Sequence, residues 1–167
     1  MRLLITGAAG FIGSNFVHLL RHERPDWSLT VLDLLTYAGH AANLEPHLAQ
    51  GTVNLVVGDV ADPEDVNRAI QGVDAVVHFA AESHVDRSIS DPLSFAKTNI
   101  IGTVNLLNNF KKLWDGNWKY KRFYHISTDE VYGSLGEIGL FKETTHYNPN
   151  SPYSASKASS DHFVRAY

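Results

Sequence analysis

The stretch LLITGAAGFIG, residues 3–13, decides the fold. Its apolar start, Leu3–Thr6, predicts a short buried strand, and the apolar spacing over Phe11–His22 predicts a helix. We expect that helix to carry Phe11, Ile12, Phe16, Leu19 and Leu20 on one side. Glycines between a strand and a helix let the backbone turn tightly and approach a pyrophosphate, whose charge the helix N-terminus attracts. Gly7, Gly10 and Gly13 therefore predict a dinucleotide-binding turn.

The rest of the chain alternates strand-like and helix-like segments. Further apolar runs predict strands at Leu29–Leu32, Val53–Val57, Ala75–Phe79 and Phe123–Ile126, and helices are expected at Pro63–Gln71, Leu93–Leu113 and Pro152–Tyr167. Such alternation predicts a parallel sheet with helices on both faces. Right-handed crossovers give the strand order 3-2-1-4-5 of an α/β, doubly wound, Rossmann-type fold.

The composition of the chain argues against two classes of binding partner, nucleic acids and membranes. The 167 residues carry a net charge of −4, no run of Lys or Arg and no cysteine. Nucleic acid and anionic membranes attract positive surfaces, so neither is expected as a partner. The chain also lacks an apolar run of about 18 residues, the length that spans a membrane. With no cysteine to oxidise, a cytoplasmic setting is expected.

Two acidic residues support the predicted cofactor site. Asp33 ends the second predicted strand, twenty residues after Gly13, where a carboxylate holds the adenosine ribose hydroxyls. A carboxylate repels a 2′-phosphate, so NAD is favoured over NADP. Asp59 follows the third strand and is a second candidate, for the adenine edge, although an Asp in a turn is equally often structural.

Tyr153 and Lys157 are candidates for proton transfer. They lie four residues apart on the last predicted helix, hence on one face. A lysine cation beside a phenol lowers the pKa of the phenol, which favours removal of a proton from a sugar hydroxyl.

A second polar group follows the fifth strand. Thr128, Asp129 and Glu130 come at the carboxyl edge of the sheet, where doubly wound folds keep their sites. Of two adjacent carboxyl groups, one can stay protonated as an acid while the other acts as a base, if their surroundings differ.

Several longer strings carry a family resemblance. They are TGAAGFIGSNF (6–16), LTYAG (35–39), FAAESHVDRSI (79–89), TNIIGT (98–103), HISTDEVYG (125–133) and PYSASKASSDH (152–162). In this order they resemble the extended short-chain dehydrogenase/reductases, and within them the dTDP-glucose 4,6-dehydratases. The presence of Asp129 beside Glu130 favours dehydratases of dTDP- or UDP-glucose. Leu34 stands where the family often has Lys.

The resemblance implies a lyase reaction without net redox change. Tyr153 would deprotonate the C4 hydroxyl as hydride passes to NAD, with Thr128 holding that oxygen and Lys157 tuning Tyr153. Glu130 would then remove the C5 proton and Asp129 would protonate the departing C6 hydroxyl. Hydride return to C6 gives the 4-keto-6-deoxy sugar.

The same resemblance assigns binding roles. It implies NAD contacts at Phe11, Ile12, Asp33, Thr36, Asp59, Val60, Ala80, Ala81, Thr98, Tyr153 and Lys157, beside the turn glycines, and sugar contacts at Ser83 and Thr128. It also implies a homodimer when the protein is full length.

The predicted chain organisation is incomplete relative to that family. Residues 129–151 are irregular and glycine-bearing, typical of a functional loop. A doubly wound sheet usually extends beyond five strands, and the sequence stops within a helix. We expect residues 1–167 to form the NAD-binding domain with the catalytic residues, and the sugar-nucleotide-binding region to lie outside this chain. A complete minimal domain is the alternative.

Three other functions stay open at this level. They are a dehydratase acting on UDP-glucose, an epimerase or decarboxylase on the same scaffold, and an NAD-binding fragment without turnover. Metal binding is not expected: His18 and His22 share a helix face but lack the glutamate of a metalloprotease motif.

Overall fold

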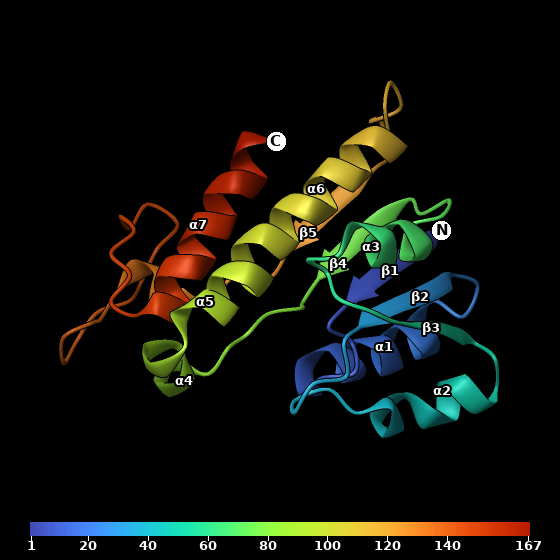
Figure 1. The fold of residues 1–167 in the computed structure, drawn as a ribbon, viewed down its shortest axis with the longest axis horizontal. Helices are drawn as coiled ribbons and strands as arrows, with labels where there is room; N and C mark the ends of the chain where they lie inside the picture. Colours follow the sequence, from blue (N-terminus) through green and yellow to red (C-terminus); the bar gives the residue numbers. More distant parts are fainter. The chain divides into compact units, whose positions relative to one another are not determined.

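The computed structural model describes residues 1–167, which divide into two compact units (Figure 1). Unit 1 comprises Met1–Ala80 and Asn105–Ile126. Unit 2 comprises Ala81–Val104 and Ser127–Tyr167.

Unit 1 is built on a five-stranded sheet in which every pairing is parallel. Its strands are β1 (Arg2–Thr6), β2 (Ser28–Asp33), β3 (Val53–Val57), β4 (Ala75–His78) and β5 (Arg122–His125). They lie in the order β3-β2-β1-β4-β5, so all five predicted strands and their order are confirmed. Ile5 of the central strand pairs with Val31 on one side and Val77 on the other.

Each face of the sheet of unit 1 has its own apolar core. Leu3 and Ile5 point into one core, which also holds Val17 and Leu20 of α1 (Phe11–Glu23) and Leu44 at the end of the short helix η1 (Ala41–Leu44). Leu4 points into the other core, where residues of α3 (Pro63–Ala69) and α6 (Gly102–Leu113) pack. Because successive side chains of a strand alternate between faces, this arrangement requires strands that are apolar throughout. Helices on both faces confirm the predicted α/β architecture.

The face that α1 buries matches the predicted one only in part. Leu20 is buried and Phe16 packs against the core as predicted, whereas Phe11, Ile12 and Leu19 are 82%, 66% and 55% exposed. The residues that the helix buries are Gly13, Ser14, Val17 and Leu20. Two of these four are small residues, which let a helix pack close to a strand and carry little apolar signal in the sequence.

Unit 2 is a set of helical segments around α7 (Pro152–Ala166). It contains α4 (Val85–Ser90), α5 (Pro92–Phe95), the π-helical turn η2 (Ala96–Ile101), the first residues of α6 and the 3₁₀ turn η3 (Asp129–Tyr132). The predicted helical stretch over residues 93–113 is confirmed, because α5, η2 and α6 follow one another without a break from Pro92 to Leu113; the π-helical turn within it was not predicted. The irregular stretch is confirmed from residue 133 to residue 151, and η3 precedes it.

Three short segments had no counterpart in the predictions: η1, α4, and α2 (Glu45–Ala49). Each has only four to six residues, too few to display a helical period. None of the helices combines the length and the hydropathy that crossing a membrane requires.

Candidate active site

The glycine turn of unit 1 is fixed by steric contact at two positions. Gly7 has a φ of +70°, and a Cβ placed there would lie 2.5 Å from the backbone nitrogen of Ala80. A Cβ on Gly13 would lie 2.6 Å from the Cα of Ala8. Both distances are far below van der Waals contact, so these glycines are needed for the turn itself.

Gly10 is placed differently. It precedes α1 with an ordinary φ of −77°, and no side chain caps the helix there. A Cβ on Gly10 would meet nothing nearer than the carbonyl of Gly7 at 3.3 Å. The first amides of a helix have no intrahelical partner, and together they attract an anion. The turn therefore fits the pyrophosphate of a dinucleotide, with the exposed side chains of Phe11 and Ile12 beside it.

Asp33 builds the same turn from the neighbouring strand. Its Oδ2 accepts the amide of Ala9 at 2.8 Å, and its Oδ1 accepts the amide of Leu35 at 2.9 Å. The side chain is 7% exposed, so both hydrogen bonds are shielded from water. Leu35 has a φ of +55°, which the bond to Asp33 helps to hold. The ribose contact of Asp33 stays a prediction.

The other predicted cofactor residues of unit 1 lie in turns after strands. Asp59 accepts the amide of Ala61 at 2.8 Å, and Val60 is buried. The carbonyl of Val60 accepts the side-chain amide of Asn105 at 2.8 Å. Thr36 is exposed. The amide of Ala80, which follows β4, donates to the hydroxyl of Thr6 at 3.2 Å.

In unit 2, Thr128 organises the predicted acid–base pair. Its Oγ1 accepts the amide of Glu130 at 3.3 Å and thereby caps η3, while the hydroxyl donates to Oδ1 of Asp129 at 3.4 Å. Asp129 is exposed and Glu130 is half-buried. One threonine thus contacts the carboxylate of Asp129 and the backbone amide of Glu130.

Tyr153 owes its place to the start of α7. Ser151 and Ser154 form a capping box, in which each hydroxyl accepts the other residue's amide at 3.0 Å. Pro152 fills the first helical position, where its missing N–H costs nothing. Tyr153 follows in the first turn with 8% exposure, and Lys157 lies one turn further with 3% exposure.

The surroundings of Tyr153 include Thr128, Asp129 and Glu130, so the two predicted groups of unit 2 lie close together. Burial raises the pKa of Tyr153, a hydrogen bond with the Thr128 side chain lowers it, and the charges of Glu130 and Asp129 raise it. The net shift is upward, opposite to the expected effect of Lys157. Burial lowers the pKa of Lys157 itself to about 8, against an opposing contribution from Asp161. The expectation overlooked burial, which disfavours the charged form of both residues.

Asn99, on the π-helical turn, was not among the predicted site residues, yet its side chain is hydrogen-bonded to the segments around Tyr153. Its side-chain amide donates to the carbonyl of Glu82 at 2.9 Å and to the hydroxyl of Ser156 at 2.8 Å. Its Oδ1 accepts the amide of Glu82 at 2.9 Å. Ser156 in turn donates to the carbonyl of Tyr153 at 2.6 Å. The buried side-chain amide of Asn99 thus connects the segment at Glu82, the π-helical turn and α7. Its place next to the predicted Thr98 was the feature of the sequence that could have pointed to it.

The remaining predicted residues of unit 2 flank this network. Ala81 and Thr98 are half-buried, and Ser83 is exposed just before α4. Within unit 2 the structure brings Thr128, Asp129, Glu130 and Tyr153 together.

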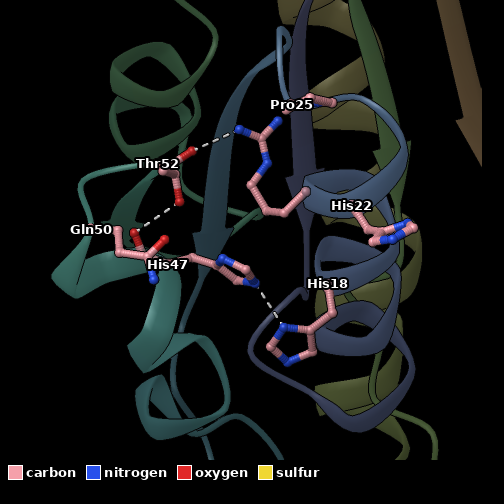
Figure 2. A pocket seen from close by; sticks show the side chains of 7 residues that line it. His18, His22, Pro25, His47, Gln50 and Thr52 are labelled. Carbon is pink, nitrogen blue, oxygen red and sulfur yellow. Dashed lines mark hydrogen bonds between the residues drawn. The ribbon is translucent and has the colours of Figure 1, made fainter.

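A pocket in unit 1 contains none of the predicted site residues (Figure 2). It lies between α1 and the segment around α2, and its lining includes His18, His22 and His47. Nδ1 of His18 lies 2.7 Å from Nε2 of His47, so His18 pairs across helices, and a dashed line joins the two ring nitrogens in Figure 2. No group of three or more side chains suited to a metal ion occurs in residues 1–167.

Comparison with known proteins gives the family. A family model described as GDP-mannose 4,6 dehydratase matches residues 4–167. The chain belongs to this family. The dTDP-glucose 4,6-dehydratase of Mycobacterium tuberculosis (strain CDC 1551 / Oshkosh) is 50% identical over 169 residues, which cover 100% of this chain and 49% of that protein. The enzyme of the same name from Xanthomonas campestris pv. campestris (strain B100) is 51% identical over 170 residues, 98% of this chain and 48% of that protein.

Solved structures agree with this assignment. A dTDP-glucose 4,6-dehydratase from Streptomyces venezuelae, with NAD bound, is 51% identical with a TM-score of 0.91 and covers 100% of this chain and 51% of that one. A UDP-glucose 4-epimerase from Thermus thermophilus in complex with NAD is 33% identical, with a TM-score of 0.87, over 100% of this chain and 50% of that one. The chain therefore spans about half the length of the relatives it matches.

Proposed function

We propose that the protein carrying this chain is an NAD-dependent lyase that dehydrates a nucleotide hexose to its 4-keto-6-deoxy form. The substrate that we favour is dTDP-glucose, because relatives about 50% identical over the whole chain carry that activity in their names. Residues 1–167 then supply the NAD-binding and catalytic part of the protein.

One observation carries the proposal: two adjacent carboxylates lie with a threonine and a buried tyrosine in unit 2. Asp129 and Glu130 both act electrostatically on Tyr153, and Thr128 hydrogen-bonds to Tyr153. A plain alcohol dehydrogenation needs a tyrosine and a lysine but has no use for a second acid–base pair. An elimination of water needs both a base and an acid.

The roles of these side chains follow from the bonds that must break. Tyr153 takes the proton of the C4 hydroxyl, and Thr128 holds that oxygen. Oxidation at C4 acidifies the neighbouring C5–H bond, so the half-buried Glu130 can remove that proton. The exposed Asp129 gives a proton to the C6 hydroxyl, which leaves as water.

The cofactor part of the proposal rests on the glycine turn. Gly7, Gly10, Gly13, Phe11 and Ile12 would hold the pyrophosphate side, and Asp33 the adenosine ribose. Thr36, Asp59, Val60, Ala80, Ala81, Thr98, Tyr153 and Lys157 complete the proposed contacts, and Ser83 touches the sugar. When bound, NAD would accept a hydride from C4 and return one to C6, while Glu130 returns the proton to C5.

Product analysis tests the reaction. The full-length protein is incubated with NAD and, separately, with dTDP-glucose, UDP-glucose and UDP-glucuronate. We expect a 4-keto-6-deoxy product from dTDP-glucose without accumulation of reduced cofactor. A C4 epimer, or a decarboxylated pentose from UDP-glucuronate, would instead assign the chain to an epimerase or decarboxylase.

A double variant tests the acid–base assignment. Asp129→Asn with Glu130→Gln keeps the shapes of both side chains, and we expect kcat to fall by about 10²–10⁴-fold. The matched control is Glu137→Gln with Glu143→Gln, two exposed acids of the irregular stretch, which should leave kcat unchanged. Retained activity in the first double variant would rule out the assigned roles.

We further propose a homodimer in a cytoplasmic setting. Leu93, Ile101 and Phe163 of unit 2 are 79%, 56% and 40% exposed, an amount of apolar surface that suits a partner subunit. The absence of cysteine suits a reducing compartment. Sedimentation of the full-length protein tests the assembly: a monomer at micromolar concentration would refute it.

A further inference from the structure

Asp161 connects three segments of unit 2 through one carboxylate oxygen. Its Oδ2 accepts the hydroxyl of Ser127 at 2.5 Å and the phenol of Tyr147 at 2.9 Å. Ser127 follows β5, Tyr147 lies in the irregular stretch, and Asp161 lies on α7. Ser127 and Tyr147, which precede Asp161 by 34 and 14 residues, thus bind to the same oxygen atom.

The connection reaches the reacting groups on both sides. Ser127 directly precedes Thr128, whose hydroxyl accepts the backbone amide of Glu130 and donates to the carboxylate of Asp129. On α7, Asp161 follows Lys157 by one helical turn, and Lys157 follows Tyr153 by another. The Ser127–Asp161 bond is therefore a direct side-chain link between the turn with the acid–base pair and the helix with the tyrosine.

The charge of Asp161 acts on the same helix. It opposes the burial that lowers the pKa of Lys157. It also contributes, after burial, to raising the pKa of Tyr147 to about 12, while Arg165 lowers that pKa. Tyr132 and His162 complete the surroundings, with ring centroids 5.3 Å and 5.1 Å from that of Tyr147. Tyr147 consequently stays a neutral donor, so the negative charge at this point belongs to Asp161.

We propose that Asp161 is a positioning residue of the active site, whose carboxylate ties Ser127 and the adjoining turn of Thr128, Asp129 and Glu130 to the helix that carries Tyr153 and Lys157. The roles of those residues in the reaction rest on the proposed function, whereas the tie itself rests on the hydrogen bonds of unit 2. Asp161 touches neither substrate nor cofactor in this account.

Two substitutions in the full-length protein separate the effect of the Ser127–Asp161 hydrogen bond from the effect of the Asp161 charge. Ser127→Ala removes the tie and keeps the carboxylate; we expect kcat to fall about tenfold with KM nearly unchanged, because a small misplacement of reacting groups is costly. Asp161→Asn removes the charge and keeps an acceptor oxygen for Ser127. We expect it to lower the pKa of Lys157 below about 8, measured by NMR titration of the lysine side chain.

A matched control removes the other hydrogen bond of Asp161. Tyr147→Phe keeps the aromatic packing and the Ser127 link, so kcat should stay within about twofold of the unsubstituted protein. Asp161→Ala also removes the link to Ser127. The double variant Ser127→Ala/Asp161→Ala should therefore have a kcat no lower than that of the slower single variant, Ser127→Ala or Asp161→Ala, because both substitutions remove the same link. Thermal unfolding confirms that each variant is folded at the assay temperature.

The outcomes are distinct. A dehydratase whose kcat is unchanged by Ser127→Ala, or falls equally with Tyr147→Phe, would overturn the positioning role. A Lys157 titration unchanged in Asp161→Asn would overturn the contribution of the charge. If the unsubstituted protein makes no 4-keto product, the proposed function fails; the Lys157 titration and the chemical shifts of Thr128 in Ser127→Ala still decide whether Asp161 holds this turn.

Discussion

The turn after β1 and the turn after β5 are held in opposite ways. Gly7 and Gly13 are needed because no side chain fits where they lie. The second turn is held by the Thr128 side chain, which bonds to the Asp129 carboxylate and the Glu130 amide, and all three residues remain partly open to water. Close backbone packing dominates in the first turn, to which Asp33 adds two hydrogen bonds, whereas a side-chain hydrogen-bond network dominates in the second. Substitutions in the first region should change stability, and those in the second should change rate.

The sharpest test of this contrast is Tyr153→Phe. Loss of the phenol removes the proposed proton acceptor, so we expect kcat to fall about 10²–10⁴-fold, which is roughly 3–5 kcal/mol of barrier. The free energy of unfolding should change by only about 1 kcal/mol, because one hydrogen bond is lost. Steady-state kinetics and urea unfolding measure the two effects. Tyr124→Phe, at a 63% exposed site, is the control and should alter neither.

The next largest effect is expected at Gly7. Gly7→Ala combines a positive φ with a close contact to Ala80, and we expect a loss of about 3 kcal/mol in stability. Gly51→Ala isolates the backbone cost, since Gly51 has a φ of +64° and no atom within 4 Å; about 1 kcal/mol is expected. Gly10→Ala should change stability little and weaken NAD binding. Equal stability losses at all three positions would contradict the steric account of the turn.

Asp33 tests whether side chains matter in the first region too. Asp33→Ala leaves the amides of Ala9 and Leu35 without acceptors in a shielded place, and we expect a loss of roughly 2–3 kcal/mol in stability. Asp33→Asn keeps one acceptor oxygen and should lose about half as much. Urea unfolding without NAD measures the structural part. A loss below about 1 kcal/mol for Asp33→Ala would show that the turn holds its shape without this carboxylate.

The smallest expected effect concerns Lys157 and depends on pH. Its pKa is about 8 in the folded chain and 10.5 for an unperturbed lysine. Below pH 8 the lysine is charged in both states, so burial of the charge lowers the free energy of unfolding by its full amount. Lys157→Met should therefore stabilise the fold by on the order of 2 kcal/mol at pH 7. As pH rises from 8 to 10.5 the folded chain alone loses this proton, and its stability should approach that of the variant. Lys142→Met, at an exposed site, should show no such gap.

Much of unit 1 could be predicted because its signals are local. The three inner strands, β2, β1 and β4, are short and mostly apolar runs buried on both faces, and glycine in the first turn has one evident use. The face of α1 could not be predicted the same way, because Gly13 and Ser14 face the sheet and contribute no apolar signal. The π-helical turn was missed because a change in hydrogen-bond register leaves the apolar spacing almost unaltered.

In unit 2 the residue types were predictable and their surroundings were not. Tyr153, Lys157 and the Asp129–Glu130 pair stand out by spacing and by resemblance. Burial, which sets the direction of the shifts at Tyr153 and Lys157, depends on segments distant in sequence. The partners of Asp161 lie 14 and 34 residues away, so no local pattern announces them.

The capping box at Ser151 has an electrical consequence. It makes α7 begin at Pro152, so the phenol of Tyr153 stands in the first turn of a fifteen-residue helix. The peptide dipoles of that helix add up to a partial positive charge at this end, which stabilises an anion by about 0.3–1 kcal/mol. A phenolate formed at Tyr153 would be favoured by this backbone field whatever the charge of Lys157. Under the proposed function, Ser151 and Ser154 thus influence the potential at the phenol that takes the first proton, without touching the substrate.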